Sequence, residues 1–185
     1  MNFIETEISG VWIIEPVRYK DARGYFCETF REDEFRAHIG PVRFVQENES
    51  MSSYGVVRGL HFQRPPHTQA KLVRVSQGEV LDVAVDLRDG SPTFGHYVAR
   101  RLSAENGLQM FVPRGFAHGF AVLSPTAQFQ YKVDNYYEKA SEGAIRFDDP
   151  SICVAWPVPT DKMLLSEKDI IAPSFEDYIK SGIKM

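Results

Sequence analysis

The sequence predicts an all-β fold, a jelly roll or similar β-barrel with small helical appendages. Short runs rich in Val, Ile, Phe and Tyr recur along the chain, and Gly or Pro separates them at 40–41, 65–66, 77–78, 89–92 and 124–125. This alternation of short strands and tight turns is typical of sandwiches and barrels. An open sheet of about ten short strands would leave exposed edges, so we expect the sheet to close.

The segment 80–87 is the clearest predicted strand. Its odd positions are all apolar, whereas its even positions include Asp82 and Asp86, so one face is apolar and the other has two carboxylates. The other predicted strands are 11–14, 25–30, 42–47, 56–63, 71–76, 97–102, 109–112, 119–123 and 128–133. Two helices are predicted, 32–39, which Gly40 ends, and 175–180.

Size and composition predict one domain spanning residues 1–185, in a cytoplasmic protein. A chain of 185 residues fits one domain, and its 43% hydrophobic and 25% charged residues argue against disorder. The net charge of −4 gives no basic surface for nucleic acid. Neither a signal peptide nor a segment of transmembrane length is recognised, so no membrane association is expected. Cys27 and Cys153 alone predict reduced thiols in the core rather than a disulfide framework.

Two histidines occur in patterns that resemble the motifs of the cupin superfamily. The second cupin motif is matched from Gly107 through Pro113 to His118, and the first begins at Gly55 and reaches His61. The resemblance implies a cupin-type jelly-roll β-barrel with both histidine rings pointing into it. Such rings can be structural, with both nitrogens satisfied by neighbours. We favour a catalytic role, because a titratable group inside a barrel that lacks a metal is most often catalytic.

The set of cupin metal ligands is incomplete in this chain. A metal-binding cupin has a second histidine where this sequence has Gln63, and a glutamate a few residues later, where it offers His67 between Pro66 and Thr68. Two imidazoles rarely hold a catalytic metal, because such sites generally use three or more protein ligands. His67 follows Pro65-Pro66, where the chain should leave the strand. We therefore predict a site without a metal.

Several segments together resemble the dTDP-4-dehydrorhamnose 3,5-epimerase family. They cover most of the chain and comprise 21–26, 46–48, 57–63, 71–74, 91–95, 103–106, 115–120 and 131–132. The resemblance implies inversion of the two carbons beside the ketone in a dTDP-linked 4-keto-6-deoxyhexose. It also implies that no redox cofactor takes part and that the protein is a homodimer.

Proton abstraction next to a ketone requires a base, a group that stabilises the enolate oxygen, and an acid on the opposite face of the ring. The resemblance gives these roles to His61, Lys71 and Tyr131. An imidazole, whose reference pKa is about 6.5, can accept a proton at neutral pH, whereas a phenol, with a reference pKa of about 10, can donate one. Asp169 would fix the tautomer of the base. The alternative for Tyr131 is an ordinary aromatic residue inside the barrel.

The family resemblance also implies a nucleotide-sugar site. Arg23 and Arg58 would bind the diphosphate, since guanidinium groups pair with phosphate oxygens in a bidentate manner. The other residues expected near the ligand are Phe26, Glu28, Gln46, Asn48, His118, Glu142 and Lys168. In a regular strand Arg58 and His61 would point to opposite faces. A β-bulge at Gly59 would bring them to the same face.

Four other functions are compatible with parts of this pattern. The closest are single-site epimerases and 3,4-ketoisomerases acting on related dTDP-sugars, because the number of inverted carbons depends on the placement of the acid. A catalytically silent sugar-binding cupin is expected to lack the base or the acid, and both His61 and Tyr131 are present. Gln63 argues against a metal-dependent oxygenase. The sequence leaves open the number of inverted carbons, the nucleotide base and the final sugar.

Overall fold

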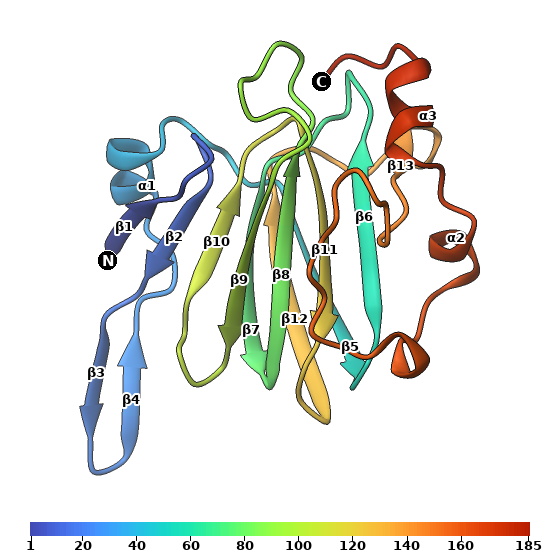
Figure 1. The fold of residues 1–185 in the computed structure, drawn as a ribbon. Helices are drawn as coiled ribbons and strands as arrows, with labels where there is room; N and C mark the ends of the chain where they lie inside the picture. Colours follow the sequence, from blue (N-terminus) through green and yellow to red (C-terminus); the bar gives the residue numbers. More distant parts are fainter.

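Two antiparallel sheets face each other and enclose the core in the computed structural model, which describes residues 1–185 (Figure 1). The first sheet consists, in spatial order, of β1 (Asn2–Glu5), β2 (Trp12–Glu15), β10 (Gln109–Val112), β7 (Lys71–Gln77), β12 (Thr126–Val133) and β5 (Gln46–Ser53). The second consists of β13 (Glu142–Ala144), β6 (Val57–Gln63), β11 (Phe116–Val122), β8 (Glu79–Asp86) and β9 (Tyr97–Ser103). The all-β, jelly-roll prediction is confirmed.

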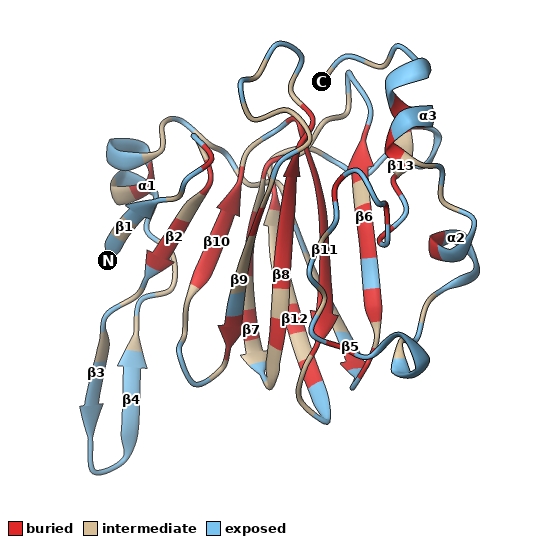
Figure 2. Ribbon diagram, in the orientation of Figure 1, coloured by how far each residue is buried: buried red, intermediate tan, exposed pale blue.

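The main core lies between the two sheets and explains the alternation seen in 80–87. On β8, Val80 and Ala84 belong to this core, together with Phe120 and Phe129, whose rings stack with centroids 4.2 Å apart. The carboxylate-bearing face of β8 is therefore the interior face. The apolar face packs on the other side against helix α3 (Phe175–Lys180) in a second cluster. Burial on both faces accounts for the continuously buried length of β11 and most of β8 (Figure 2).

Most predicted strands are confirmed within two or three residues, and the main errors lie in polar segments. The prediction of 42–47 is wrong, because 41–45 has no regular structure and the strand runs over the polar segment Gln46–Ser53. That strand is held by its ladder to β12 rather than by apolar side chains. The sequence also missed three short strands, β1, β3 (Arg18–Asp21) and β13.

Strands β3 and β4 (Gly24–Cys27) form a hairpin that projects away from the two sheets (Figure 1). The predicted strand 25–30 therefore ends early, at Cys27. The hairpin exposes three aromatic side chains, with Tyr19, Tyr25 and Phe26 accessible at 63%, 58% and 69%. Aromatic rings gathered on an exposed projection are typical of a surface that contacts another molecule.

A β-bulge at Gly59 resolves the orientation problem in β6. His118 on β11 pairs with His61, and Phe120 pairs with Arg58, so β6 has one residue more than β11 between these two pairs. Gly59 has φ of +134°, and a Cβ there would lie 2.6 Å from the Cα of Gly119. Only glycine fits both the conformation and the space. As a result Arg58 and His61 both face the barrel interior, in agreement with the predicted bulge.

The helices are short and cover the outside of the barrel. α1 (Glu32–His38) and α3 agree with the predicted helices, and α3 begins with a capping box between Ser174 and Asp177. The sequence missed α2 (Glu167–Ile170) and two 3-10 helices, η1 (Lys139–Ser141) and η2 (Thr160–Lys162). None of the helices is long and apolar enough to cross a lipid bilayer.

Both cysteines are free thiols, but their predicted place in the core is wrong. Cys153 is exposed and Cys27, at the end of the hairpin, is partly exposed. Cys153 has φ of 55°, in a tight turn whose backbone amide donates to the carbonyl of Asp149 at 2.8 Å. Its sequence neighbours Ile152 and Val154 do pack in the second core cluster, but Cys153 between them is exposed because this segment is a turn and not a buried strand.

Candidate active site

A cavity of about 290 Å³ opens between the two sheets and contains all four residues assigned to catalysis. His61 enters from β6 of the five-stranded sheet, whereas Lys71 on β7 and Tyr131 on β12 enter from the six-stranded sheet. Asp169 reaches the same cavity from helix α2. The structure therefore gathers groups that lie up to 108 residues apart in the chain. A larger cavity of about 480 Å³ shares His61, Glu142 and Lys168 with it.

His61 is held by a buried carboxylate. Its Nε2 lies 2.5 Å from Oδ1 of Asp169, whose side chain is only 3% exposed. The other oxygen, Oδ2, accepts a hydrogen bond from the hydroxyl of Ser166 at 2.6 Å. Burial alone would raise the pKa of the Asp169 carboxyl, but the hydrogen bonds from His61 and Ser166 outweigh it and lower the pKa. The carboxylate therefore stays ionised and fixes Nδ1 as the free nitrogen of the ring.

Helix α2 positions this carboxylate through its own cap. Ser166 is the N-cap residue, and its hydroxyl oxygen accepts a hydrogen bond from the backbone N–H of Asp169. Asp169 sits at the third helical position, so its side chain returns to the cap hydroxyl. The single turn of helix is thus stabilised by the same contacts that orient the carboxylate toward His61.

Lys71 carries its ammonium group in a buried, poorly hydrated environment. Burial lowers the pKa of its ammonium to about 8, although the charge of Asp82 acts to raise it. Asp82 is fully buried on β8, and His118 on β11 donates Nε2–H to both of its carboxylate oxygens, at 2.9 and 3.1 Å. Burial also lowers the pKa of His118, so this imidazole is neutral near pH 7. A protonated lysine from one sheet and a neutral histidine from the other therefore line the cavity.

Tyr131 lies on the sheet opposite His61. Burial raises the pKa of its phenol, and the charge of Arg58 and a hydrogen bond with Asn48 only partly oppose that effect. The phenol therefore remains protonated at neutral pH and can act as a proton donor. Its ring packs at the border of the main core, 6.1 Å from the ring of Phe129. Packing on one side and the cavity on the other fix the direction of the hydroxyl group.

The remaining substrate-binding predictions divide into two groups. Arg58, His118, Glu142 and Lys168 line the cavity. Asn48 pairs with Tyr131 across the strands, and Gln46 donates to the side-chain oxygen of Asn48 at 2.9 Å, so both lie beside the cavity. Glu142 and Lys168 form an ion pair of 2.6 Å.

Arg23, Phe26 and Glu28 are not brought to the cavity of their own chain. Arg23 is at the tip of the hairpin, where its side chain is 90% exposed and pairs only with Asp21. Phe26 borders a different cavity of about 410 Å³ beneath the hairpin. Glu28 is exposed just after β4.

Four polar residues at or beside the site were not predicted from the sequence. The alternation in 80–87 placed Asp82 opposite the apolar face, which is ordinarily the solvent face, so no signal in the sequence indicated that Asp82 lies between the sheets. Ser166 and Asp169 have the spacing of a capping pair, which could have predicted helix α2. Glu49 and Ser50, which also line the cavity, lie in a polar strand with no such signal.

Gln63, which stands where metal-binding cupins have their second histidine, has a structural role. The side-chain oxygen of Gln63 accepts a hydrogen bond from the backbone N–H of Glu138 at 2.8 Å. His67 lies beyond the end of β6 and bonds to the hydroxyl of Ser141 through Nδ1. No three His, Cys, Asp or Glu side chains gather in a way that could hold a metal ion.

The comparisons with known proteins agree with this chemistry. A family model described as dTDP-4-dehydrorhamnose 3,5-epimerase matches residues 5–177. The dTDP-4-dehydrorhamnose 3,5-epimerase of Shigella flexneri is 52% identical over 178 residues, which cover 96% of this chain and 97% of the relative.

Solved structures resemble the fold over almost the whole chain. The dTDP-6-deoxy-D-glucose-3,5-epimerase of Legionella pneumophila, in complex with dTDP-4-keto-L-rhamnose, has a TM-score of 0.94 and 46% identity, covering 99% of this chain and 97% of that chain. A 3'-monoepimerase from Streptomyces bikiniensis, in complex with dTDP-quinovose, has a TM-score of 0.90 and 34% identity, covering 96% and 90%.

Proposed function

The chain belongs to the dTDP-4-dehydrorhamnose 3,5-epimerase family, and from this premise we propose that it inverts C3 and C5 of dTDP-4-dehydro-6-deoxy-D-glucose in dTDP-L-rhamnose biosynthesis. One observation supports the chemistry most strongly. His61 and Tyr131 enter a single cavity from opposite sheets, and Lys71 lies in the same cavity. This is the arrangement that removal of a proton from one face of a ring and its replacement on the other face requires.

Each inversion proceeds in two proton transfers. The free nitrogen of His61 takes the proton from the carbon next to the ketone, and the C–H electron pair moves into an enolate whose oxygen is stabilised by the ammonium of Lys71. The imidazolium that forms is stabilised by Asp169. Tyr131 then gives its phenolic proton to the opposite face of the same carbon. Proton exchange with water restores both groups before the second carbon reacts.

The nucleotide diphosphate is bound by Arg58 in this proposal. Two nitrogens of its guanidinium donate to the hydroxyl of Ser52, at 3.2 and 3.1 Å, which holds the side chain beside the cavity. The third guanidinium nitrogen has no such partner within the chain. A guanidinium that is held on one side is suited to bind phosphate oxygens with the other.

The proposed assembly is a homodimer in which the hairpin β3–β4 reaches the partner's cavity. Arg23 and Phe26 are assigned to the nucleotide by family resemblance, yet both are exposed on the projecting hairpin, Arg23 at its tip and Phe26 along β4. Figure 2 shows the hairpin as largely exposed. Within one chain they contribute nothing to the cavity. In a two-fold dimer each hairpin would complete the site of the other chain, and the exposed aromatic rings would be buried.

Mixed dimers test this arrangement. We expect His61→Ala and the double variant Arg23→Ala/Phe26→Ala each to lose most activity as homodimers. After co-expression, half of the dimers are mixed, and one of their two sites has an intact cavity and an intact hairpin, so about a quarter of wild-type activity returns. Equal mixtures of separately folded variants, kept below the time needed for subunit exchange, are the control. Absence of recovery in mixed dimers that have been isolated with two different tags would contradict the shared site.

A single-site epimerase is the second candidate, supported by the similarity to the 3'-monoepimerase. The product distinguishes the two. We expect the purified protein, in buffer containing EDTA, to convert dTDP-4-dehydro-6-deoxy-D-glucose into a sugar inverted at both C3 and C5, as read from proton coupling constants by NMR. A product inverted at C3 alone would assign the chain to the monoepimerases. Activity that vanishes with EDTA and returns with a divalent ion would overturn the metal-free mechanism.

A further inference from the structure

A fully buried carboxylate stands behind the cavity without lining it. Asp82 is 0% exposed in the middle of β8, between the apolar residues of two core clusters. Both of its oxygens accept from Nε2 of His118, and no other side chain donates to them. A buried carboxylate is costly unless it is paired, and a neutral imidazole supplies only one donor. The hydrogen bond from His118 therefore offsets only part of the free-energy cost of burying the Asp82 charge.

The missing compensation comes from Lys71. Burial raises the pKa of the Asp82 carboxyl, and His118 and the charge of Lys71 only partly oppose that rise. Asp82 in turn is the one carboxylate whose charge acts to raise the pKa of the Lys71 ammonium. The two residues come from facing sheets, Asp82 from β8 and Lys71 from β7. Attraction between two charges is stronger in a low-dielectric protein interior than in water.

We propose that Asp82 is a positioning residue of the active site, which fixes the ring of His118 and supplies the countercharge that keeps Lys71 cationic beside the reacting ketone. This inference rests on the proposed function, in which the Lys71 cation stabilises the enolate oxygen. The carboxylate itself does not touch the cavity. It acts through His118 and Lys71.

The other charged groups around Lys71 are already engaged. His61 pairs with Asp169, and Glu142 pairs with Lys168. Glu49 accepts a hydrogen bond from Gln130 at the exposed rim of β5, and Asp134, next to β12, pairs with Arg114. Tyr131 is a neutral phenol, and Arg58 has the same charge as Lys71. On the side of Asp82, its cross-strand neighbour Arg100 pairs with Glu7.

The direction of the pH effect follows from these charges. With its pKa at about 8, Lys71 is a cation below pH 8 and loses its charge as the pH rises through that value. Asp82 acts to raise this pKa, so removing the carboxylate lowers it further. Asp82→Asn keeps the volume of the side chain and an oxygen that can accept from His118, but it removes the charge. We expect the alkaline limb of kcat to move from near pH 8 to lower pH by about one unit.

A direct titration separates this inference from the proposed function. In protein labelled with ¹³C at lysine Cε, the signal that Lys71→Arg removes reports the charge of Lys71 without any substrate. We expect its midpoint to fall in Asp82→Asn by about the same one unit as the alkaline limb. A wild-type protein that does not epimerise the sugar would refute the proposed function and leave this titration valid. Asp82→Ser, which retains an acceptor, provides the same readout should Asp82→Asn not fold.

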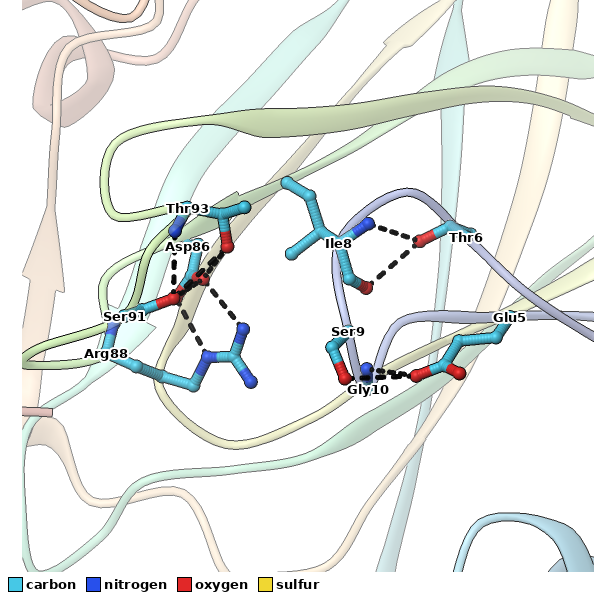
Figure 3. A network of polar contacts seen from close by, with 9 residues as sticks. All are labelled: Glu5, Thr6, Ile8, Ser9, Gly10, Asp86, Arg88, Ser91 and Thr93. Carbon is cyan, nitrogen blue, oxygen red and sulfur yellow. Dashed lines mark hydrogen bonds and ion pairs between the residues drawn. The ribbon is translucent and has the colours of Figure 1, made fainter.

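The matched control is a second carboxylate, four residues further along the same strand. Asp86 is on the same face of β8 and is also fully buried, but it is held by Arg88, Ser91 and Thr93 at the end of the barrel (Figure 3). Asp86→Asn should reduce thermal stability without moving the Lys71 midpoint or the alkaline limb. An unchanged Lys71 midpoint in Asp82→Asn, or an equal shift in Asp86→Asn, would overturn the proposal.

Discussion

Replacement of His61 by alanine or asparagine is expected to lower proton exchange at the sugar by about 10² to 10⁴-fold, the usual contribution of a general base. His61 is the only imidazole in the cavity that is free to accept a proton. Its Nε2 bonds to Asp169, which leaves Nδ1 as the free acceptor, whereas His118 is bonded to Asp82 and has a lowered pKa. Neither substitution leaves a group that can be protonated near pH 7. Affinity for dTDP should change less than about threefold, since in the proposed function Arg58, and not His61, binds the diphosphate.

Two measurements check this expectation on the same samples. Deuterium entry from heavy water, followed by NMR, reports the base, and calorimetry with dTDP reports the nucleotide site. His67→Ala is the matched control, because His67 is also partly buried but bonds to Ser141 outside the cavity. Exchange at the wild-type rate in His61→Ala, with His67→Ala also unaffected, would remove His61 from its assigned role.

The barrel could be predicted because its apolar strands have clear patterns. The alternation in 80–87 and the turn residues between the runs correspond to β8 and to the connections of the central strands. The polar strand Gln46–Ser53 could not be predicted in this way, because its ladder with β12 depends on residues about 80 positions away. Of the hairpin, β4 was predicted as part of 25–30, but β3 was missed because its residues are mostly exposed and show no apolar alternation.

The site could be predicted in part, for a different reason in each case. The bulge at Gly59 was required by the positions of Arg58 and His61, and the register of β6 with β11 contains it. Asp169 was assigned from resemblance alone, because no local pattern connects it with His61, 108 residues away. The link between Asp82 and Lys71 could not be anticipated, since it depends on how two sheets face each other. Charge coupling across a core becomes visible only in three dimensions.

Tyr131→Phe is expected to separate proton removal from inversion. The substitution deletes the phenolic proton and keeps the ring, whose contacts with Phe129 and the core are apolar, so the fold should be little affected. Inversion should fall by about 10² to 10⁴-fold, as for loss of a general acid. Abstraction by His61 should continue, because the base, its partner Asp169 and the enolate-stabilising Lys71 are unchanged.

The fate of the enolate in this variant follows from the geometry of the cavity. Without the phenol, the protonated His61 is the nearest acid, and it lies on the face from which the proton was removed. After exchange with heavy water it returns a deuteron to that same face. Tyr178→Phe is the matched control, because that tyrosine is also buried but its hydroxyl donates to the carbonyl of Leu87 in the other core cluster. It should leave the ratio of exchange to inversion at the wild-type value.

The most direct measurement is therefore the ratio of deuterium entry to inversion in Tyr131→Phe, taken by NMR from one reaction in heavy water. If His61 and Tyr131 act from opposite walls of the cavity, deuterium enters next to the ketone with retained configuration much faster than inverted sugar forms. Inversion at the wild-type rate would mean that Tyr131 is a packing residue. Loss of exchange as complete as in His61→Ala would mean that the two residues act in one coupled step, and would contradict the division into base and acid.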